Sequence, residues 1–67
     1  MYKMNKTLKV KDILTVKEVS EILNLRYETI LRYILNKELV ASKLGRVWRI
    51  RRTDLNKFLL ERENTRN

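Results

Sequence analysis

The spacing of the apolar residues changes midway along this 67-residue sequence, and that change limits the folds it can adopt. From about residue 14 to residue 38, apolar residues recur every three or four positions, which is the period of an amphipathic helix. From residue 39 to residue 51 they alternate more closely with polar residues around Gly45, the only glycine. Helical spacing returns after residue 52. We therefore predict a small α+β domain made of two helices, a β-hairpin and a closing helix.

Packing alone must hold such a domain together. A chain this short buries only about 60% of the surface that it exposes when unfolded, so we expect one domain without a roomy pocket. The sequence contains no cysteine and no histidine, which excludes disulfides, zinc fingers, thiol nucleophiles and imidazole bases. We accordingly expect a protein that is not an enzyme and that takes no metal, cofactor or small molecule.

The first helix is marked at both of its ends. Thr15 precedes Glu18 by three residues, the spacing of a capping box, and Leu14 stands where it can pack against Val19. Asn24 tolerates a left-handed backbone, so we expect the helix to end there. Its apolar stripe is predicted to contain Val16, Val19, Ile22 and Leu23.

A second helix is expected over Tyr27–Glu38, where Ile30, Tyr33 and Ile34 keep the helical spacing. Only about three or four residues separate it from the first helix, so the two cannot lie flat against each other and should form a helix-turn-helix. The second helix of that motif is the candidate for reading DNA.

The hairpin and the last helix are expected to complete the core. Gly45 suits the positive φ of the hairpin tip, and Trp48 and Ile50 should point inward. We interpret Trp48 as a core residue rather than a platform for base stacking. Arg52 or Thr53 is expected to open the last helix. The outward residues of the second hairpin arm are predicted to be Val47, Arg49 and Arg51, and the core residues of the last helix Leu55, Phe58 and Leu59.

The two ends of the chain are read as separate from the domain. Residues 1–12 are predicted to be a flexible basic N-terminal arm, residues 13–62 the folded domain and residues 63–67 a polar tail. No apolar run approaches the roughly 20 residues that a bilayer requires. The basic start also lacks the apolar stretch of a signal peptide. We expect a cytoplasmic, nucleoid-associated protein without membrane contact.

Charge is concentrated in particular segments. The net charge is +8, and residues 26–37 contribute +2 and residues 38–52 contribute +4, whereas residues 13–25 carry −1. A nearly neutral scaffold that carries basic contact segments is typical of a protein that binds nucleic acid. The alternative, a generally basic surface without a role, remains open at this point.

Four motifs occur in one order: LTVKEVSEIL, LRYETILRYI, the glycine hairpin KLGRVWRI and the closing RRTDLNKFL. Together they resemble the excisionase-type domain, with a MerR-like winged helix-turn-helix, over Ile13 to about Leu60. The resemblance implies that the second helix enters the major groove of double-stranded DNA and that the hairpin reaches the flanking minor groove. It also implies a protein that binds sites at the ends of a mobile element, bends DNA and directs an integrase, expected to be of the tyrosine type, toward excision. Cooperative self-association on DNA is expected as well.

The candidate DNA contacts follow from those two elements. An arginine can bond guanine bidentately, and a glutamate can accept from a cytosine amine. The candidates are Arg26, Tyr27, Glu28, Thr29, Arg32 and Asn36 on the second helix, Lys43, Gly45, Arg46 and Arg49 on the hairpin, and Lys17 on the first helix for phosphate. Alternatives remain: Glu28 can pair with Arg32 at i, i+4, Thr29 can be a packed residue, and the hairpin cations can simply protect an edge strand.

Some residues depart from the family pattern. Arg26 replaces a capping serine, Lys37 replaces the glycine that ends the second helix, and Val40 and Arg51 replace prolines. Leu31 and Leu35 are apolar where relatives are commonly polar or aromatic, which allows packing on the arm or hairpin, or contact with a partner. Two other functions therefore stay open: a small MerR-like transcription regulator, and a protein-interaction module or antirepressor.

Overall fold

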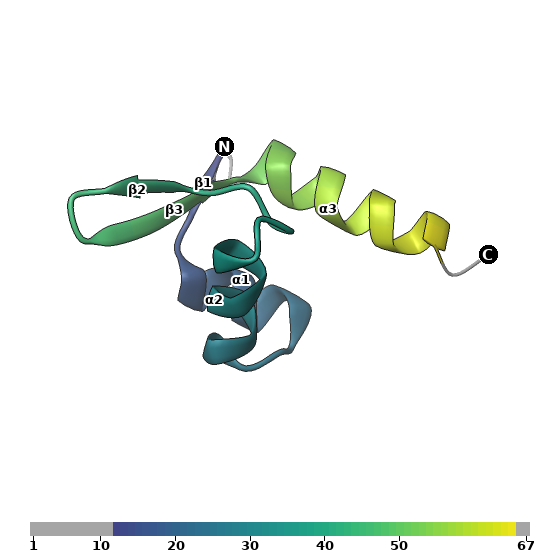
Figure 1. The fold of residues 1–67 in the computed structure, drawn as a ribbon, viewed down its shortest axis with the longest axis horizontal. Helices are drawn as coiled ribbons and strands as arrows, with labels where there is room; N and C mark the ends of the chain where they lie inside the picture. The colour runs from purple at the N-terminus through teal and green to yellow at the C-terminus, as the bar shows by residue number, and fades with distance from the viewer. Residues whose placement is uncertain (1–11, 66–67) are drawn as a thin grey trace, which may run out of the picture.

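A computed structural model describes residues 12–65 of the chain (Figure 1). The elements follow in the order β1 (Ile13–Leu14), α1 (Val16–Leu23), α2 (Tyr27–Leu35), β2 (Ser42–Leu44), β3 (Val47–Arg51) and α3 (Arg52–Thr65). The predicted α+β class and the predicted order of helices, hairpin and closing helix are confirmed. Residues 1–11 of the predicted arm, and residues 66 and 67, lie outside the described residues.

One apolar cluster joins all three helices to the sheet. Ile30 on α2 and Ile50 on β3 are completely buried, and Leu55 of α3 is 1% exposed. Trp48 is half-buried and packs against this cluster, as predicted for a core residue. The other buried apolar residues are Leu14, Val16, Val19, Ile34, Leu39 and Phe58. Burial of these side chains is the main favourable contribution to folding, since the chain has no disulfide.

The sheet has three strands where the sequence predicted two. β1 pairs with β3 in antiparallel register, with Ile13 opposite Arg51 and Leu14 opposite Ile50, so the strand order is β1-β3-β2. The Arg52 N–H also donates to the Asp12 carbonyl at 2.8 Å. A strand of two residues is too short to show an alternating pattern, which is why the sequence did not reveal it.

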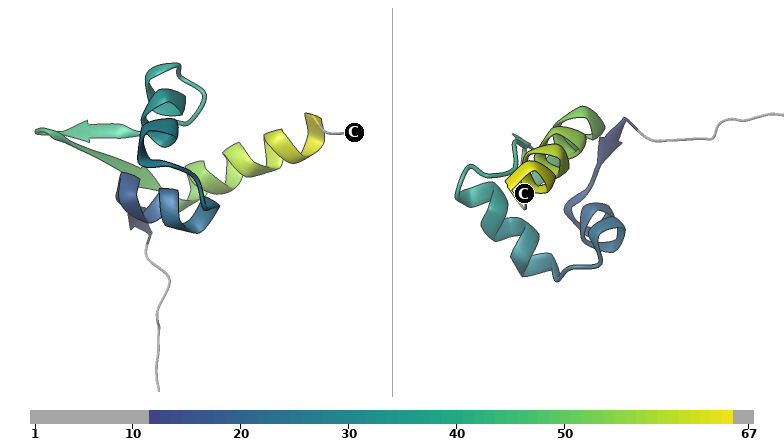
Figure 2. Two further views of the ribbon diagram at one scale, coloured as in Figure 1. Left: turned by 90° about the horizontal axis from the view of Figure 1, so that it is seen from below. Right: turned by 90° about the vertical axis from the view of Figure 1, so that its right-hand side faces the viewer.

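The hairpin extends away from the body of the molecule, on the side opposite to the end of α3 (Figures 1 and 2). β2 and β3 pair with Leu44 opposite Val47, so Gly45 and Arg46 form a two-residue turn. Gly45 has a φ of +67°, whereas Arg46 is not among the residues of positive φ. A positive φ at only the first turn residue matches a type II′ turn, in which glycine takes that position.

Both ends of α1 match the prediction. The Thr15 N–H donates to Glu18 Oε1 at 2.9 Å, and the Glu18 N–H donates to Thr15 Oγ1 at 3.0 Å, which completes the capping box. Asn24 ends the helix with a φ of 57°. The Leu25 N–H then donates to the Ser20 carbonyl at 2.9 Å, as in a Schellman motif.

α2 ends at Leu35, three residues earlier than predicted. Lys37 has a φ of +67°, and its N–H donates to the Ile34 carbonyl at 3.0 Å. The Glu38 N–H donates to the Tyr33 carbonyl at 2.8 Å, so this end is also a Schellman motif. The left-handed residue that it requires is a lysine here, although glycine adopts a positive φ more easily.

Two predicted core residues are wrong. Ile22 is 48% exposed, and Leu59 is 38% exposed. In α1 the buried stripe consists of Val16, Val19 and Ser20, because a helix of 3.6 residues per turn carries position 22 away from the axis of that stripe. Ser20 satisfies its hydroxyl by donating to the Lys17 carbonyl at 2.6 Å.

α3 is anchored to α2 by side chains far apart in the sequence. Arg62 forms an ion pair with Glu38, which follows α2, and its guanidinium carbon lies 5.2 Å from the centre of the Tyr33 ring. The Tyr33 and Phe58 rings are 5.2 Å apart between centroids. α3 also continues through residues 63–65, which the sequence had assigned to the polar tail.

Candidate nucleic-acid interface

The outer face of α2 is opposite the residues that this helix buries in the core. Ile30 and Ile34 are buried, and Leu31 and Tyr33 beside them are half-buried against the core. The helical period therefore turns the opposite side chains outward. The exposed residues of this face are Glu28, Arg32, Leu35 and Asn36. The outer face of α2 thus presents three predicted DNA-contact residues and one large apolar side chain.

α2 begins without a side-chain cap. Arg26 is the N-cap residue, and no hydrogen bond from its side chain closes the helix. Its backbone carbonyl accepts from the Thr29 N–H at 3.0 Å. Arg26 is exposed and Tyr27 is 50% exposed, so both face solvent at the start of the helix.

The alternatives for Glu28 and Thr29 have different outcomes. No ion pair links Glu28 to Arg32 within residues 12–65, and no partner is recorded for either charged group. The Arg32 guanidinium is therefore available to an external anion. Thr29 is half-buried, which fits the interpretation of a packed residue as well as that of a contact residue.

The hairpin that we call the wing, residues 42–51, carries its cations on both faces. Lys43 lies opposite Trp48 in the register, and its Nζ is 5.4 Å from the centre of the indole ring. Arg46 is exposed in the turn. Arg49 is half-buried, and its Nη1 donates to the Trp48 carbonyl at 3.0 Å. Arg51 is held by Asp54 at 3.2 Å.

Position 45 requires glycine because of its backbone conformation, and not because a larger side chain would clash. A Cβ built on Gly45 would have no heavy atom within 4 Å. The positive φ alone therefore explains the glycine. The close approach of this tip to DNA stays a prediction.

Lys17 lies on α1, in its first turn, and is exposed. The sequence reasoning also left out a cation that the fold brings to the surface between the helices and the wing. Lys37 is exposed directly after α2, and it lines a hollow of about 230 Å³ together with Val40 and Trp48. The sequence signal that could have revealed Lys37 is a lysine at the end of a helix, where glycine is the usual left-handed residue.

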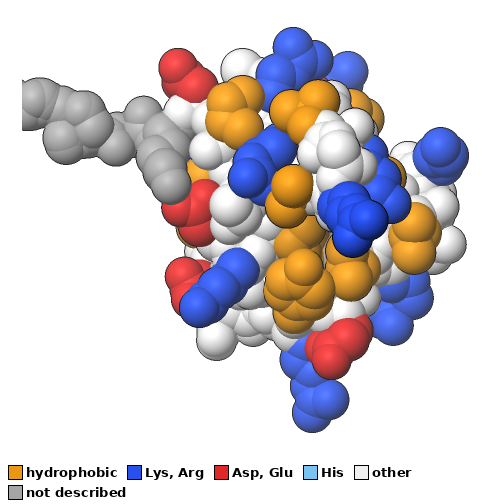
Figure 3. Space-filling view, turned by 90° about the vertical axis from the view of Figure 1, so that its left-hand side faces the viewer, with side chains coloured by type: hydrophobic (Ala, Val, Ile, Leu, Met, Phe, Trp, Pro, Cys, Tyr) orange, Lys and Arg blue, Asp and Glu red, His pale blue; other side chains and the backbone are white. Residues whose placement is uncertain are grey.

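Figure 3 views the molecule from the side of the wing tip, and Lys and Arg side chains are distributed among hydrophobic ones over this face. From Leu39 to Thr53 the sequence contains five cations and no carboxylate. Closely spaced cations without carboxylates favour contact with a polyanion.

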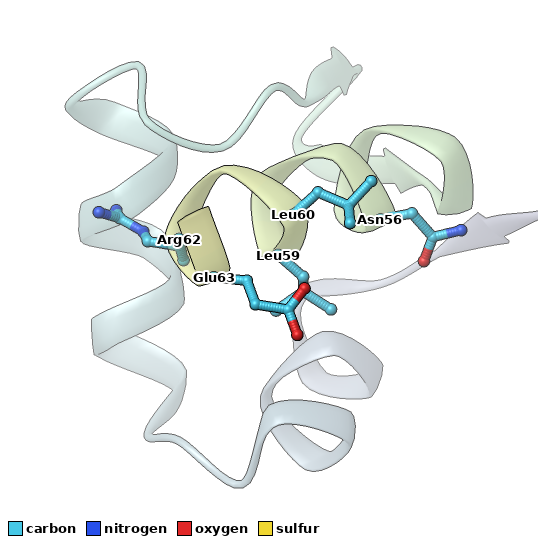
Figure 4. A pocket seen from close by; sticks show the side chains of 5 residues that line it. All are labelled: Asn56, Leu59, Leu60, Arg62 and Glu63. Atoms are coloured by element: carbon cyan, nitrogen blue, oxygen red, sulfur yellow. The ribbon is translucent and has the colours of Figure 1, made fainter. Parts of the chain in front are cut away.

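A larger hollow than the one beside Lys37 lies along α3 (Figure 4). It measures about 600 Å³ and is lined by α3 residues alone, namely Asn56, Leu59, Leu60, Arg62 and Glu63. Arg62 is already engaged with Glu38. Within residues 12–65, no group of three acidic residues, histidines or cysteines is placed to hold a metal ion. No helix of that same part of the chain is long and apolar enough to cross a membrane.

Three helices, a three-stranded antiparallel sheet and a projecting hairpin define a small winged helix-turn-helix protein. The model of a protein family described as a helix-turn-helix domain matches residues 13–63, and the chain belongs to this family. It is a DNA-binding helix-turn-helix protein, and its partner is double-stranded DNA. No curated protein and no solved structure matches the chain.

Proposed function

We propose that the protein is an excisionase-type architectural factor. It binds sites at the ends of a mobile element, bends the DNA and directs a tyrosine-type integrase toward excision. The observation that carries this proposal is the set of exposed cations on α2 and the wing that have no carboxylate partner. They are Arg26, Arg32, Lys43 and Arg46. The order of motifs over Ile13 to Leu60 supports the excisionase type.

α2 is the element that we place in the major groove. That groove is about 12 Å wide and accepts one α-helix. Arg32 projects from the solvent face of α2 without an ion-pair partner, which leaves its guanidinium for the bidentate contact to guanine. Glu28 and Asn36 extend the same exposed face and are suited to a cytosine amine and to adenine.

The start of α2 is suited to phosphate. The first N–H groups of a helix lack intrahelical partners, and they bind anions readily where no side chain caps them. Arg26 adds a full positive charge at this place, and Tyr27 adds a hydroxyl donor. Lys17, on the first turn of α1, supplies a further phosphate contact.

The wing is the element that we place in the flanking minor groove. Its tip projects beyond the helices (Figure 1), and Arg46 is exposed in the turn. The minor groove attracts arginine because its electrostatic potential is negative. Lys43 and Arg49 flank the tip and are suited to the phosphates on either side.

A bending role requires more than one molecule. Smoothly bending a site of 20 to 30 base pairs costs on the order of 1 to 6 kcal/mol. A domain with one recognition helix and one wing makes few contacts to offset that cost. We therefore expect cooperative binding of several copies, or binding together with the integrase.

A small transcription regulator is the second candidate, because it would use the same face of α2 and the same wing. A protein-interaction module is favoured by one observation only, the 66% exposure of Leu35 in the middle of the cationic face. Leu35 is equally suited to touch a thymine methyl group, since it lies one turn after Arg32 on the exposed side of α2.

The binding part of the proposal is tested by titrating DNA from the element ends at two salt concentrations. We expect the logarithm of the binding constant to fall steeply and linearly with the logarithm of the salt concentration, because each neutralised phosphate releases condensed counterions. Replacement of Lys43, which we assign to phosphate, by alanine should reduce that slope by about 1. The matched control is Lys57→Ala on α3, which removes an exposed cation outside the proposed interface. Weak binding without salt dependence contradicts the proposal and favours the protein-interaction module.

The recombination part needs a separate assay. Deletion of the gene is followed by measurement of the excised circular element and of transcript levels. We expect the circular product to fall. Unchanged excision with altered transcripts would favour the transcription regulator.

A further inference from the structure

The wing tip carries a pair of apolar side chains that the core does not use. Leu44 is 61% exposed and Val47 is 49% exposed, and the register places them opposite each other next to the turn. Neither residue belongs to the buried core cluster. The alternation along the strands puts them on the face of the sheet away from Trp48 and Ile50.

The charges around this pair indicate what can cover it. Arg46 stands in the turn between the two residues, and Lys43 and Arg49 are the next cations on either strand. No carboxylate interrupts residues 39–53. A second wing of the same chain would bring like charges together, so a polyanion is the complementary partner.

The dimensions point to the minor groove. Two neighbouring strands lie about 4.8 Å apart, and the minor groove of straight DNA is about 6 Å wide. A hairpin that carries side chains fits only if the groove opens. Proteins that open this groove commonly insert an apolar side chain between base pairs, which unstacks them and kinks the duplex.

We propose that Leu44, supported by Val47 across the strand pair, is an apolar wedge that enters the minor groove and kinks the DNA. This inference rests on the proposed function, and it assigns the bend to one side chain. Leu44 is the wedge because it is the longer and the more exposed of the two, on β2 at the outer edge of the sheet. Val47 is the support, since its branched Cβ restricts its side chain.

The experiment measures binding and bending separately on one DNA site, by titration and by fluorescence energy transfer between dyes at the DNA ends. The variant is Leu44→Ser. Leu44→Met tests whether apolar length is sufficient, and Leu60→Ser is the control. Leu60 lies on α3 and is 59% exposed, so both serine variants replace a leucine of nearly equal exposure.

We expect Leu44→Ser to lose most of the bend and to bind straight DNA about tenfold more weakly. A mismatched base pair beneath the wing should restore most of its affinity, because less stacking then has to be broken. Leu44→Met should bend DNA as the parent protein does, and Leu60→Ser should match it in both measurements.

Three outcomes would overturn the wedge while the parent protein still binds DNA. They are a normal bend by Leu44→Ser, binding by the parent protein without any bend, and a loss in Leu44→Ser of cooperative binding to adjacent sites alone. The last would mean that the tip contacts a neighbouring protein molecule. Failure of the parent protein itself to bind DNA would instead overturn the proposed function, and the wedge with it.

Discussion

α1 and α2 are similar in length, with 8 and 9 residues, yet they are stabilised in different ways. α1 begins with a reciprocal capping box and ends at an asparagine that accepts the left-handed backbone easily. α2 begins at the uncapped Arg26 and ends before Lys37, a residue that adopts a φ of +67° at a cost. Local sequence therefore secures α1, whereas α2 depends on the packing of Ile30 and Ile34.

The difference has a functional reason under the proposed DNA contacts. A capping side chain at the start of α2 would occupy the N–H groups that we assign to phosphate, and it would replace the charge of Arg26. α1 carries no such role along most of its length, and its segment has a net charge of −1. Under this proposal, the helix that we assign to the major groove is the one that gives up local stability.

The largest expected effect concerns the packing of α2. Ile30→Ala should lower the free energy of unfolding by about 3 kcal/mol, because it empties a completely buried site under a helix that has weak ends. Urea denaturation followed by circular dichroism measures the loss. Leu35→Ala on the exposed side of the same helix should change stability by no more than about 0.5 kcal/mol. Equal losses in the two variants would contradict the described placement of α2.

The next effect concerns recognition. Arg32→Ala should weaken binding to a specific site by about 1 to 3 kcal/mol and leave the stability of the fold nearly unchanged. The side chain has no ion-pair partner to lose within residues 12–65. Lys57→Ala is again the matched control. An unchanged affinity in competition between specific and unrelated DNA would remove Arg32 from the interface.

The side-chain cap at the start of α1 is expected to contribute about 1 kcal/mol to the free energy of unfolding. Thr15→Ala removes the hydroxyl that accepts from the Glu18 N–H and should destabilise the fold by about that amount. Thr15→Ser keeps the acceptor and should remain close to the parent protein. Because Thr15 lies outside the proposed interface, the salt dependence of DNA binding should not change in either variant.

At the start of α2, adding a cap should stabilise the fold, whereas removing the cap of α1 destabilises it. Arg26→Ser supplies the missing cap and should raise the free energy of unfolding by about 1 kcal/mol, while DNA binding weakens. The two measurements together test the proposed exchange of stability for binding. A stabilised variant that binds DNA as tightly as before would show that Arg26 makes no contact.

The smallest expected effect lies at the two helix ends. Lys37→Gly should stabilise the protein by up to about 1 kcal/mol, because glycine adopts a positive φ without steric strain. Asn24→Gly should change stability by less, since asparagine already tolerates that conformation. Thermal unfolding of both variants measures the difference, and an equal gain in the two would contradict the strain assigned to Lys37.

The features that the sequence predicted correctly rest on interactions within a few residues of the chain. The capping box joins Thr15 to a residue three positions away, Asn24 ends α1 through its own backbone preference, and Gly45 forms a two-residue turn. The absence of a cap at Arg26 was readable for the same reason. Such features depend on the identity of neighbouring residues, so the sequence alone contains them.

The features that only the tertiary structure decided join residues far apart. β1 becomes a strand because Leu14 meets Ile50, and the end of α3 is fixed where Arg62 reaches Glu38 and the ring of Tyr33. The helical period alone also did not determine whether Leu59 faces the core or solvent, and packing against the neighbouring elements leaves it 38% exposed. Such outcomes depend on which surfaces meet once the chain has folded, and no short stretch of sequence specifies that by itself.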